Sequence, residues 1–392
     1  MSWDEGINLG VRFEHACQLG RALHPHWSLG RSYGGFARAL SGTSDRVAKA
    51  CVRRLQQQMQ GCAGPYWTRC GKRAFAVDGS RREAPHTAAN EAGLGCAGRE
   101  KTAPQVFHTT MYHMGLGLPW DFRVGPGTDS ERRHLEDMLA GLPEHSLIVA
   151  DAGFVGYETC QRILAADHDF LLRVGSNVTL LKDLGYDVQL EGPDRVWLWP
   201  QDQQRRGAPL VLRLIQVTHG EQTIYLVTNV LDEQELSQEE AALLYEMRWG
   251  VEVFYRSYKQ TLDRHTLLSR TPKTCLAEAQ WTMLGVWLLG LLAVTRQLEE
   301  GHDPLGLSMA KARDTVRLAM RRATAHQPHG KALGYGLIHA RLDRYVRRGS
   351  KTARNYPRKK QQTPPGSPKI KTATPEEVAR AARLRKKLHP VA

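Results

Sequence analysis

The chain has 392 residues, of which 41% are hydrophobic and 24% are charged, and its net charge at pH 7 is +14. This length predicts two or three domains with a sizeable buried core. The seven cysteines include no Cys-x2-Cys pair, which argues against a zinc site and favours free thiols in a reducing cytoplasm. Asp4 and Glu5 precede any apolar stretch, so we expect no secretory signal.

The positive charge is concentrated at the two ends of the chain. Residues 1–72 hold 10 Lys and Arg against 4 Asp and Glu, and residues 341–392 hold 16 against 3. The middle of the chain is therefore slightly acidic. Basic segments neutralise nucleic-acid phosphates, whereas carboxylates can hold a metal ion. The basic end also fits a disordered tail with only non-specific affinity for nucleic acid.

The first 72 residues are predicted to be helical. Leu9 to Leu23 forms an amphipathic stretch, and Ser44-Asp45 is a candidate cap for a second helix that ends near Gln60. As a basic module, residues 1–72 are a candidate DNA-binding region. They contain no clear helix-turn-helix pattern, and a packing role without DNA contact fits them equally well.

Two short apolar runs each lead into an aspartate followed by small residues. The first is Arg73-Ala-Phe-Ala-Val-Asp78-Gly-Ser, and the second is Ser146-Leu-Ile-Val-Ala-Asp151-Ala-Gly. Such runs predict buried strands of a partly parallel sheet, whose carboxyl ends are common ligand sites. We therefore expect each strand to end at its aspartate. A lone Asp in this position is more often an ordinary turn residue.

Between residues 73 and 175 the pattern predicts a mixed α/β sheet. The expected order is strand, loop, strand, strand, helix, strand, helix and strand. After the first strand, the expected elements are strands at Gln105–His113 and Trp120–Val124, a helix at Ser130–Leu142 capped by Ser130, a strand at Leu147–Ala150, a helix at Gly156–Ala166 and a strand at Asp169–Val174.

Residues 176–233 interrupt this alternation with β-rich sequence. Strands are expected at Arg195–Trp199, Leu210–Val217 and Gln222–Val230, with a turn at His219-Gly220. Trp197 and Trp199 alternate along one strand and so share a face. Packing into a small local core is the favoured role for both.

Between residues 245 and 259 the spacing predicts a helix that presents reactive side chains on one face. Viewed down the helix axis, Tyr245 and the positions three, seven and fourteen residues after it lie within a sector of about 60°. A carboxylate there can bind a hard cation, and the cations can hold phosphate oxygens. An ordinary solvated face with one charge pair fits too. The reactive set is Tyr245, Arg248, Glu252 and Lys259, opposite the apolar set Met247, Val251, Phe254 and Tyr258.

The remaining segments are predicted as helices and a tail. Trp281 to Val294 is an apolar run of fourteen residues, shorter than the roughly 20 needed to cross a bilayer, so we expect a buried core helix and no membrane contact. Residues 301–348 are expected to be helical. Residues 349–392 are expected to form a basic, Pro-rich flexible tail with a short basic helix at Glu376–Leu388.

Taken together, these residues resemble the DDE transposases of bacterial insertion sequences, in the group named insertion sequence four. The resemblance covers about residues 73 to 300 and is carried mainly by the helix signature Tyr-x2-Arg-x3-Glu-x6-Lys. It extends to three further features: Asp78-Gly79-Ser80, the turn from Asp151 to Phe154, and Trp249 after the signature arginine.

The resemblance implies a ribonuclease H-like catalytic core with a mixed five-stranded sheet. This core would occupy residues 73–175 and 234–300, carry a β-rich insertion at 176–233, and be flanked by helical regions at 1–72 and 301–348. It implies a catalytic, metal-binding triad of Asp78, Asp151 and Glu252 for two Mg²⁺ ions, with Mn²⁺ as a substitute. The implied DNA or phosphate contacts are Tyr245, Arg248, Lys259, Trp249 and Arg256.

The resemblance also implies the partners and the reaction. These are cleavage and strand transfer of double-stranded DNA at terminal inverted repeats, by a homodimer in the bacterial cytoplasm, associated with the nucleoid. In some members of the family an insertion tryptophan holds a flipped base, a role for which Trp197 and Trp199 are candidates. Two alternatives stay open: a nuclease of the same fold without strand transfer, and a non-catalytic DNA-binding protein derived from a transposase.

Overall fold

The computed structural model describes residues 1–97, 103–186, 192–204, 206–219, 222–262, 265–323, 330–342 and 366–388. The chain divides into two compact units. The first comprises Met1–Thr68, Asp78–Met138 and Gly250–Tyr345, and the second comprises Arg69–Val77, Leu139–Trp249 and Val346–Ala392. The chain thus passes from one unit to the other inside a strand and inside the helical segment that carries the signature.

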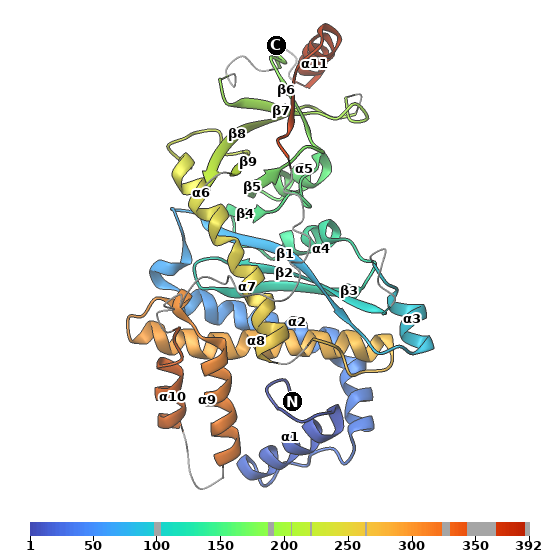
Figure 1. Cartoon of the computed structure of the whole chain (residues 1–392), viewed down its shortest axis with the longest axis vertical. Coiled ribbons are helices and arrows are strands. Elements are labelled where there is room, and N and C mark those ends of the chain that lie inside the picture. Colours follow the sequence, from blue (N-terminus) through green and yellow to red (C-terminus); the bar gives the residue numbers. More distant parts are fainter. Residues whose placement is uncertain are drawn as a thin grey trace, which may run out of the picture. The chain divides into compact units, whose positions relative to one another are not determined.

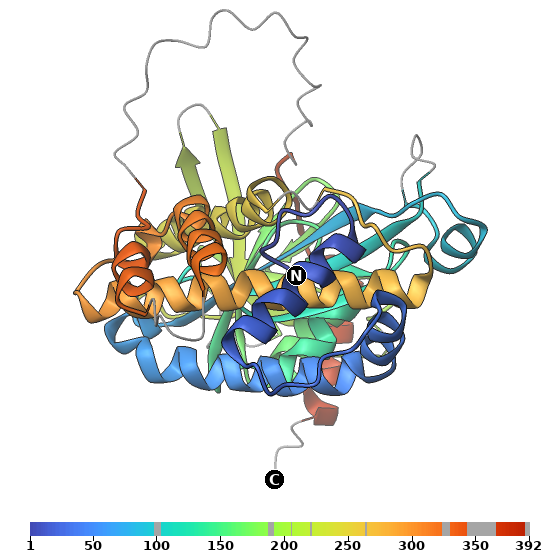
Figure 2. The same cartoon turned by 90° about the horizontal axis from the view of Figure 1, so that it is seen from below.

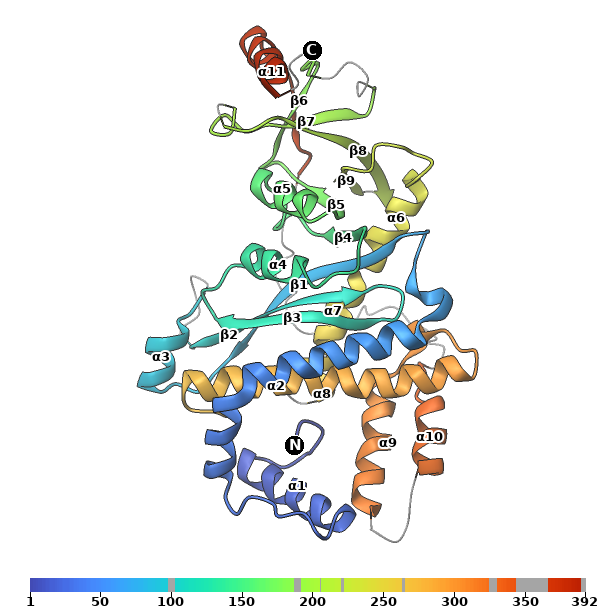
Figure 3. The same ribbon diagram turned by 180° about the vertical axis from the view of Figure 1, so that it is seen from behind.

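In the first unit, long strands are covered by long helices. Strand β2 (Gln105–His113) has its predicted bounds and pairs antiparallel with β3 (Leu118–Pro126), beside the second half of β1 (Arg73–Glu83). Every residue of β2 is buried, as expected for a central strand covered on both faces. Helices α2 (Tyr33–Cys62) and α8 (Pro272–Glu299) run side by side against β3 (Figures 1 and 3).

Helix α8 forms the centre of this core. The apolar run was correctly predicted to be a core helix, but the helix is 28 residues long, because Thr271 caps it well upstream of Trp281. Trp287 is fully buried, and its Nε1 lies 3.1 Å from Sδ of Met59. By length and composition α8 is the one helix in the described part of the chain that could cross a membrane, and 61% of its most apolar window is buried in the protein.

The N-terminal helices match the prediction only in part. Helix α1 has the predicted bounds Leu9–Leu23, capped by the Asn8 side chain. The second helix, α2, begins at Tyr33 instead of near Ser44, and its cap is Ser32. Ser44 is instead buried within α2, where its Oγ accepts a hydrogen bond from Nε1 of Trp281. Two glycines follow Tyr33 and weaken the local helix signal, so the sequence pattern predicts a later start than the structure has.

Where the structure describes residues 301–348, they are mainly helical, as predicted. Helices α9 (Met309–Arg322) and α10 (Gly330–Ile338) pack on each other and on α8 (Figure 2). A short helix, α3 (Ala88–Leu94), follows β1, and α4 (Glu131–Leu139) follows β3. Helix α4 begins directly after Ser130, whose carbonyl oxygen accepts from the backbone N of His134.

In the second unit, strands continue a mixed sheet from the first half of β1. Strand β4 (Ser146–Ala150) lies between β1 and β5 (Asp169–Val174), and both pairings are parallel. Helix α5 (Tyr157–Ala165) connects β4 to β5, and β5 has its predicted bounds. The parallel arrangement predicted from the two apolar runs is therefore confirmed.

The strands within residues 176–233, for which a β-rich insertion is predicted, extend this same sheet. Strands β6 (Thr179–Lys182), β7 (Arg195–Leu198), β8 (Leu210–His219) and β9 (Gln222–Thr228) form antiparallel pairs, and β9 pairs with β5. The strand order in this unit is β10-β6-β7-β8-β9-β5-β4-β1. The predicted turn includes Gly220, which lies outside the described residues.

The predicted flexible tail is wrong at Lys369–Thr372, which forms a strand, whereas the short basic helix predicted at Glu376–Leu388 is confirmed. Strand β10 (Lys369–Thr372) pairs in parallel with β6, and α11 (Pro375–Leu388) follows it. Residues 349–365 of the tail lie outside the described part of the chain. Gln204 is buried and holds α11 in place: its side-chain nitrogen donates to Glu377 at 2.9 Å, and its oxygen accepts from Arg380 at 2.5 Å.

We expect Gln204→Ala to loosen this helix from the sheet. The substitution removes the two hydrogen bonds that the buried amide makes with α11 and a longer one, of 3.4 Å, to the carbonyl oxygen of Trp199, which corresponds to a loss of about 1–3 kcal/mol of stability. Limited proteolysis should then cut between β10 and α11 faster than in the wild-type protein. Gln203→Ala is the matched control, because that neighbouring side chain bonds only to Asp202; equal cutting rates in the two variants would contradict the role of Gln204.

Candidate active site

Asp78 lies inside β1, not at its end. The residues after Asp78 are still part of the sheet, and the strand ends only at Glu83. Gly79 permits a close approach there. A Cβ atom on Gly79 would lie 2.7 Å from Oε1 of Glu131 and 2.7 Å from the ring of Phe107. A second carboxylate, from the first turn of α4, is thus placed next to the Asp78-Gly79 peptide.

Tyr255 links the strand of Asp78 to the helix of Glu252. Its buried hydroxyl lies 3.1 Å from the carbonyl oxygen of Asp78 and 2.9 Å from Oγ1 of Thr110. Burial and the charge of Asp78 raise the pKa of Tyr255 well above its ordinary value, so the phenol stays protonated and can donate. Glu252 lies three residues earlier in α7 (Trp249–Arg256), so it shares the side of the helix on which Tyr255 is anchored.

Further polar contacts hold the end of this helix to β1. Nζ of Lys259 donates to Oγ of Ser80 at 2.7 Å. The buried guanidinium of Arg82 donates to the Tyr258 hydroxyl at 2.6 Å. His108 lies edge-on to Tyr258, and burial together with the charges of Arg82 and Lys259 holds the pKa of His108 well below its usual range. The histidine is therefore neutral in the folded protein.

The signature segment is not one regular α-helix. Helix α6 (Gln238–Met247) ends at Met247 with Arg248 as its C-cap, α7 follows, and residues Ser257–Thr261 form a π-helical turn that contains Lys259. A π turn holds more residues than an α turn. The prediction of one regular helix across residues 245–259 is therefore wrong. Of the predicted apolar set, Val251, Phe254 and Tyr258 are buried and Met247 is only half-buried.

The first two signature residues belong to the second unit. Tyr245 and Arg248 are both 8% exposed, and the Arg248 guanidinium lies 5.4 Å from the centre of the Tyr245 ring. Each therefore has a partner inside the protein. By contrast, Trp249 is 54% exposed and Arg256 is exposed, so these two side chains are accessible to a ligand.

Asp151 directly follows β4, as predicted. Its Oδ1 accepts a hydrogen bond of 2.8 Å from the backbone N of Gly153, which is the turn expected after a strand. The side chain is half-buried. The parallel pairing of β1 with β4 matches Ala76 with Val149, so each aspartate comes two residues after this matched pair.

Two of the three predicted metal ligands, Asp78 and Glu252, are in the first unit, and Asp151 is in the second. Across the described ranges, no group of three or more His, Cys, Asp or Glu side chains is arranged so that it could hold a metal ion. All three residues are carboxylates. Such oxygen ligands suit a hard divalent cation and not zinc, which favours nitrogen and sulfur.

The tryptophans of the insertion are buried. Trp197 and Trp199 are each 2% exposed, and Nε1 of Trp199 donates to the carbonyl oxygen of Gly207 at 2.9 Å. This burial agrees with a packing role in the second unit. A contact with a flipped base would require either ring to leave its present position.

Several site residues are not evident from the sequence pattern. Tyr258 belongs to the predicted apolar face, Tyr255 has no predicted role, and Glu131 is predicted only as part of a helix. The polar contacts of the two tyrosines reach residues more than 100 positions away in the chain. The one local signal for Tyr255 is its spacing of three from Glu252, which places the two side chains on neighbouring positions of a helix.

Comparisons with known proteins identify the family of this site. Residues 69–288 match the model of the transposase DDE domain, and the chain belongs to this family. It is similar to the transposase InsG for insertion sequence element IS4 of Escherichia coli (strain K12), with 26% identity over 284 residues that cover 69% of this chain and 63% of that protein.

Further similarities are more distant. A putative transposase for insertion sequence element IS4SA of Synechocystis sp. is 21% identical over 200 residues, which cover 49% of this chain and 55% of that protein. The chain thus spans about 55% to 63% of the length of these relatives. Among solved structures, the piggyBac transposase synaptic complex with hairpin DNA matches with a TM-score of 0.35 and 12% identity, over 72% of this chain and 60% of that chain.

Proposed function

We propose that the protein is a DNA transposase that cleaves DNA at the ends of an insertion sequence and transfers the freed strand to a target. The observation that carries this proposal is the link between Asp78 and the helix of Glu252 through Tyr255, inside a DDE domain. A transposase needs its metal-binding carboxylates held in fixed positions. This link fixes the strand of Asp78 to the helix of Glu252. The InsG relative supports the same activity by its name.

We infer further that the catalytic core is ribonuclease H-like. Five strands support this, in the order β3-β2-β1-β4-β5, with β2 and β3 antiparallel and β1, β4 and β5 parallel. In this proposal, residues 73–175 and 234–300 form the core and residues 176–233 form the insertion. The two helical regions, 1–72 and 301–348, flank the core.

Asp78, Asp151 and Glu252 are the proposed ligands of two Mg²⁺ ions, for which Mn²⁺ can substitute. A pair of bound ions would activate the attacking oxygen and stabilise the leaving oxygen of an in-line displacement at phosphorus. Tyr255 would hold Asp78 in place through the hydrogen bond to its carbonyl oxygen, and Ser80 would hold Lys259 in place by accepting a hydrogen bond from Nζ.

The proposed DNA contacts are the remaining signature residues. Lys259 is held near Asp78 by Ser80, and Arg256 and Trp249 are exposed on the same helical segment. Arg248 and Tyr245 would reach DNA only after giving up their contact with each other inside the protein. The proposed partners are double-stranded DNA with terminal inverted repeats, target DNA, and a second copy of the chain in the DNA complex, within the bacterial cytoplasm and at the nucleoid.

The test is cleavage of a labelled duplex that carries the inverted repeat flanking the gene, with Mg²⁺ and with a second, unlabelled duplex as target. We expect a cut at the repeat boundary, followed by a joined product. Cleavage without joining would replace the proposal by a nuclease of the same fold. Binding without cleavage in Mg²⁺ and in Mn²⁺ would contradict the catalytic function.

A further inference from the structure

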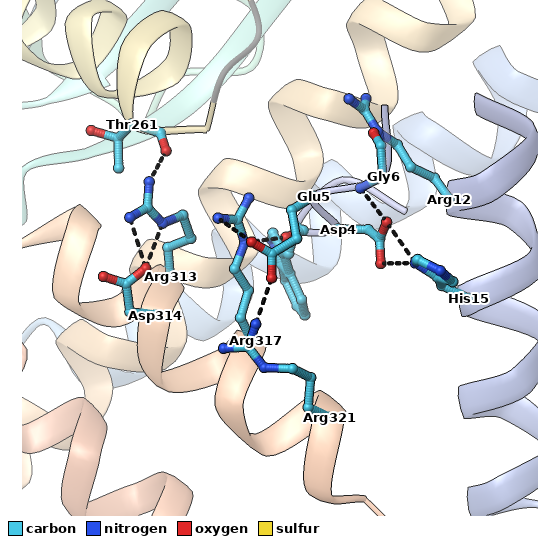
Figure 4. A network of polar contacts seen from close by, with 11 residues as sticks. Asp4, Glu5, Gly6, Arg12, His15, Thr261, Arg313, Asp314, Arg317 and Arg321 are labelled. Carbon is cyan, nitrogen blue, oxygen red and sulfur yellow. Dashed lines mark hydrogen bonds and ion pairs between the residues drawn. The ribbon is translucent and has the colours of Figure 1, made fainter. Parts of the chain in front are cut away.

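One side of α9 carries a row of arginines. Arg313, Arg317 and Arg321 follow at intervals of four residues, so each is turned by only about 40° from the one before. Arg313 is already engaged inside the protein, since it donates to the carbonyl oxygen of Thr261 and pairs with Asp314 (Figure 4). Arg317 and Arg321 instead share one carboxylate from another part of the chain, which makes these two arginines the candidate anion site.

A carboxylate occupies these two arginines. One oxygen of Glu5 lies 2.6 Å from the Arg321 guanidinium, and the other lies 3.7 Å from that of Arg317 (Figure 4). One oxyanion thus has an oxygen on each of two guanidinium groups. A phosphate group offers the same arrangement of anionic oxygens, and arginine binds it well.

The chain before α1 is anchored so that Glu5 reaches this place. Nε1 of Trp3 donates to the carbonyl oxygen of Gly285 at 2.8 Å, and the Ser2 hydroxyl donates to that of Trp281 at 3.1 Å, both on α8. Nε of Arg317 in turn donates to the carbonyl oxygen of Trp3 at 2.7 Å. The backbone before and at Trp3 is therefore held, and Glu5 follows it directly.

Asp4 and Glu5 line a cavity of about 350 Å³ between α1 and α9. Its wall includes Arg317 and Arg321 from α9 and His15 from α1, and Nδ1 of His15 lies 3.1 Å from Asp4. The side chains of Arg321 and Glu5 are 62% and 56% exposed. A ligand from solution can therefore reach Arg321 and compete with the carboxylate, whereas the Arg317 side chain is only 14% exposed and becomes accessible where Glu5 leaves it.

We propose that this α1–α9 cavity binds a backbone phosphate of DNA through Arg317 and Arg321, and that Glu5 holds the same arginines until DNA displaces it. The inference rests on the proposed function, because a transposase binds DNA and DNA is a polyanion. Glu5 then acts as a built-in competitor, which weakens binding to arbitrary DNA. Tight binding requires enough other phosphate contacts to outweigh the lost ion pair.

Glu5→Gln in the full-length protein tests this directly. We expect the affinity for a 30-base-pair duplex of arbitrary sequence to rise about threefold, because an exposed ion pair is weak and its loss removes little competition. The dependence of the affinity on salt should become steeper by about one phosphate contact. Arg321→Gln should weaken binding about threefold. In an Arg321→Gln background, Glu5→Gln should have little further effect.

Glu299→Gln is the matched control. Glu299 also pairs with an exposed arginine, Arg296, at 2.8 Å, but on α8. An equal gain in affinity from Glu299→Gln and Glu5→Gln would reduce the effect to net charge and overturn the role of the cavity. That role would also be overturned if the wild-type protein bound duplex and Arg321→Gln did not change its affinity. A wild-type protein that binds no duplex would overturn the proposed function itself.

Discussion

Glu252→Gln is expected to reduce the rate of DNA cleavage at least about 10³-fold while the affinity for the same duplex changes less than about twofold. The substitution keeps the size and hydrogen-bonding ability of the side chain but removes the charge that a divalent cation requires. Metal-dependent stabilisation of the reacting phosphate would then be lost, and this stabilisation supplies a large share of the barrier reduction in such reactions. Duplex affinity depends mainly on Lys and Arg, which the substitution leaves in place.

The measurement is single-turnover cleavage of the inverted-repeat duplex, with binding measured in Ca²⁺ or without metal. Glu246→Gln is the control, because Glu246 is exposed on the preceding helix α6 and has no proposed role. Asp78→Asn and Asp151→Asn should each give the same loss. A Glu252→Gln protein that still cleaves at near the wild-type rate would remove Glu252 from the proposed metal ligands. Equal losses of binding and cleavage would point to a DNA contact instead.

Elements that depend on local pattern were predictable from the sequence. Strands β2 and β5 and helix α1 have the predicted bounds, because each is a continuous apolar or amphipathic run between polar breaks. Helix α6 begins with a capping box at Ser237 and Glu240, which is also a local signal. The end of β1 was misplaced, because the polar residues after Val77 are held in the sheet by neighbouring strands.

Elements that depend on distant partners were not predictable. Strand β10 is short, exposed and preceded by a Pro-rich segment, and it is a strand only because β6, nearly 190 residues earlier, offers a free edge. The π turn at Ser257–Thr261 has no sequence signature, and it changes the angle of Lys259. The same holds for the candidate site. Its carboxylates stand out in the sequence, whereas the contacts that hold Asp78 and Lys259 in place involve the distant residues Tyr255 and Ser80.

Those supporting contacts lead to the second large effect, which is expected from Tyr255→Phe. The substitution removes only the hydroxyl that joins the helix of Glu252 to the carbonyl oxygen of Asp78 and to Thr110. Residues that orient metal ligands in this way typically affect metal affinity or activity by about 10–100-fold. We therefore expect cleavage to slow by about that factor, and the Mg²⁺ concentration for half-maximal cleavage to rise. Duplex binding should stay within about twofold of the wild-type value.

The shift in Mg²⁺ requirement separates a positioning role from simple damage to the core. Loss of one buried hydroxyl also costs about 1–3 kcal/mol of stability, because its partners are left without a donor, and a purely structural role would lower the unfolding temperature without moving the Mg²⁺ midpoint. Tyr112→Phe is the matched control, since Tyr112 is a buried tyrosine of β2 packed on Phe254 of the same helix. If both variants gave the wild-type Mg²⁺ midpoint, Tyr255 would be a packing residue and the firm placement of Asp78 and Glu252 would need another source.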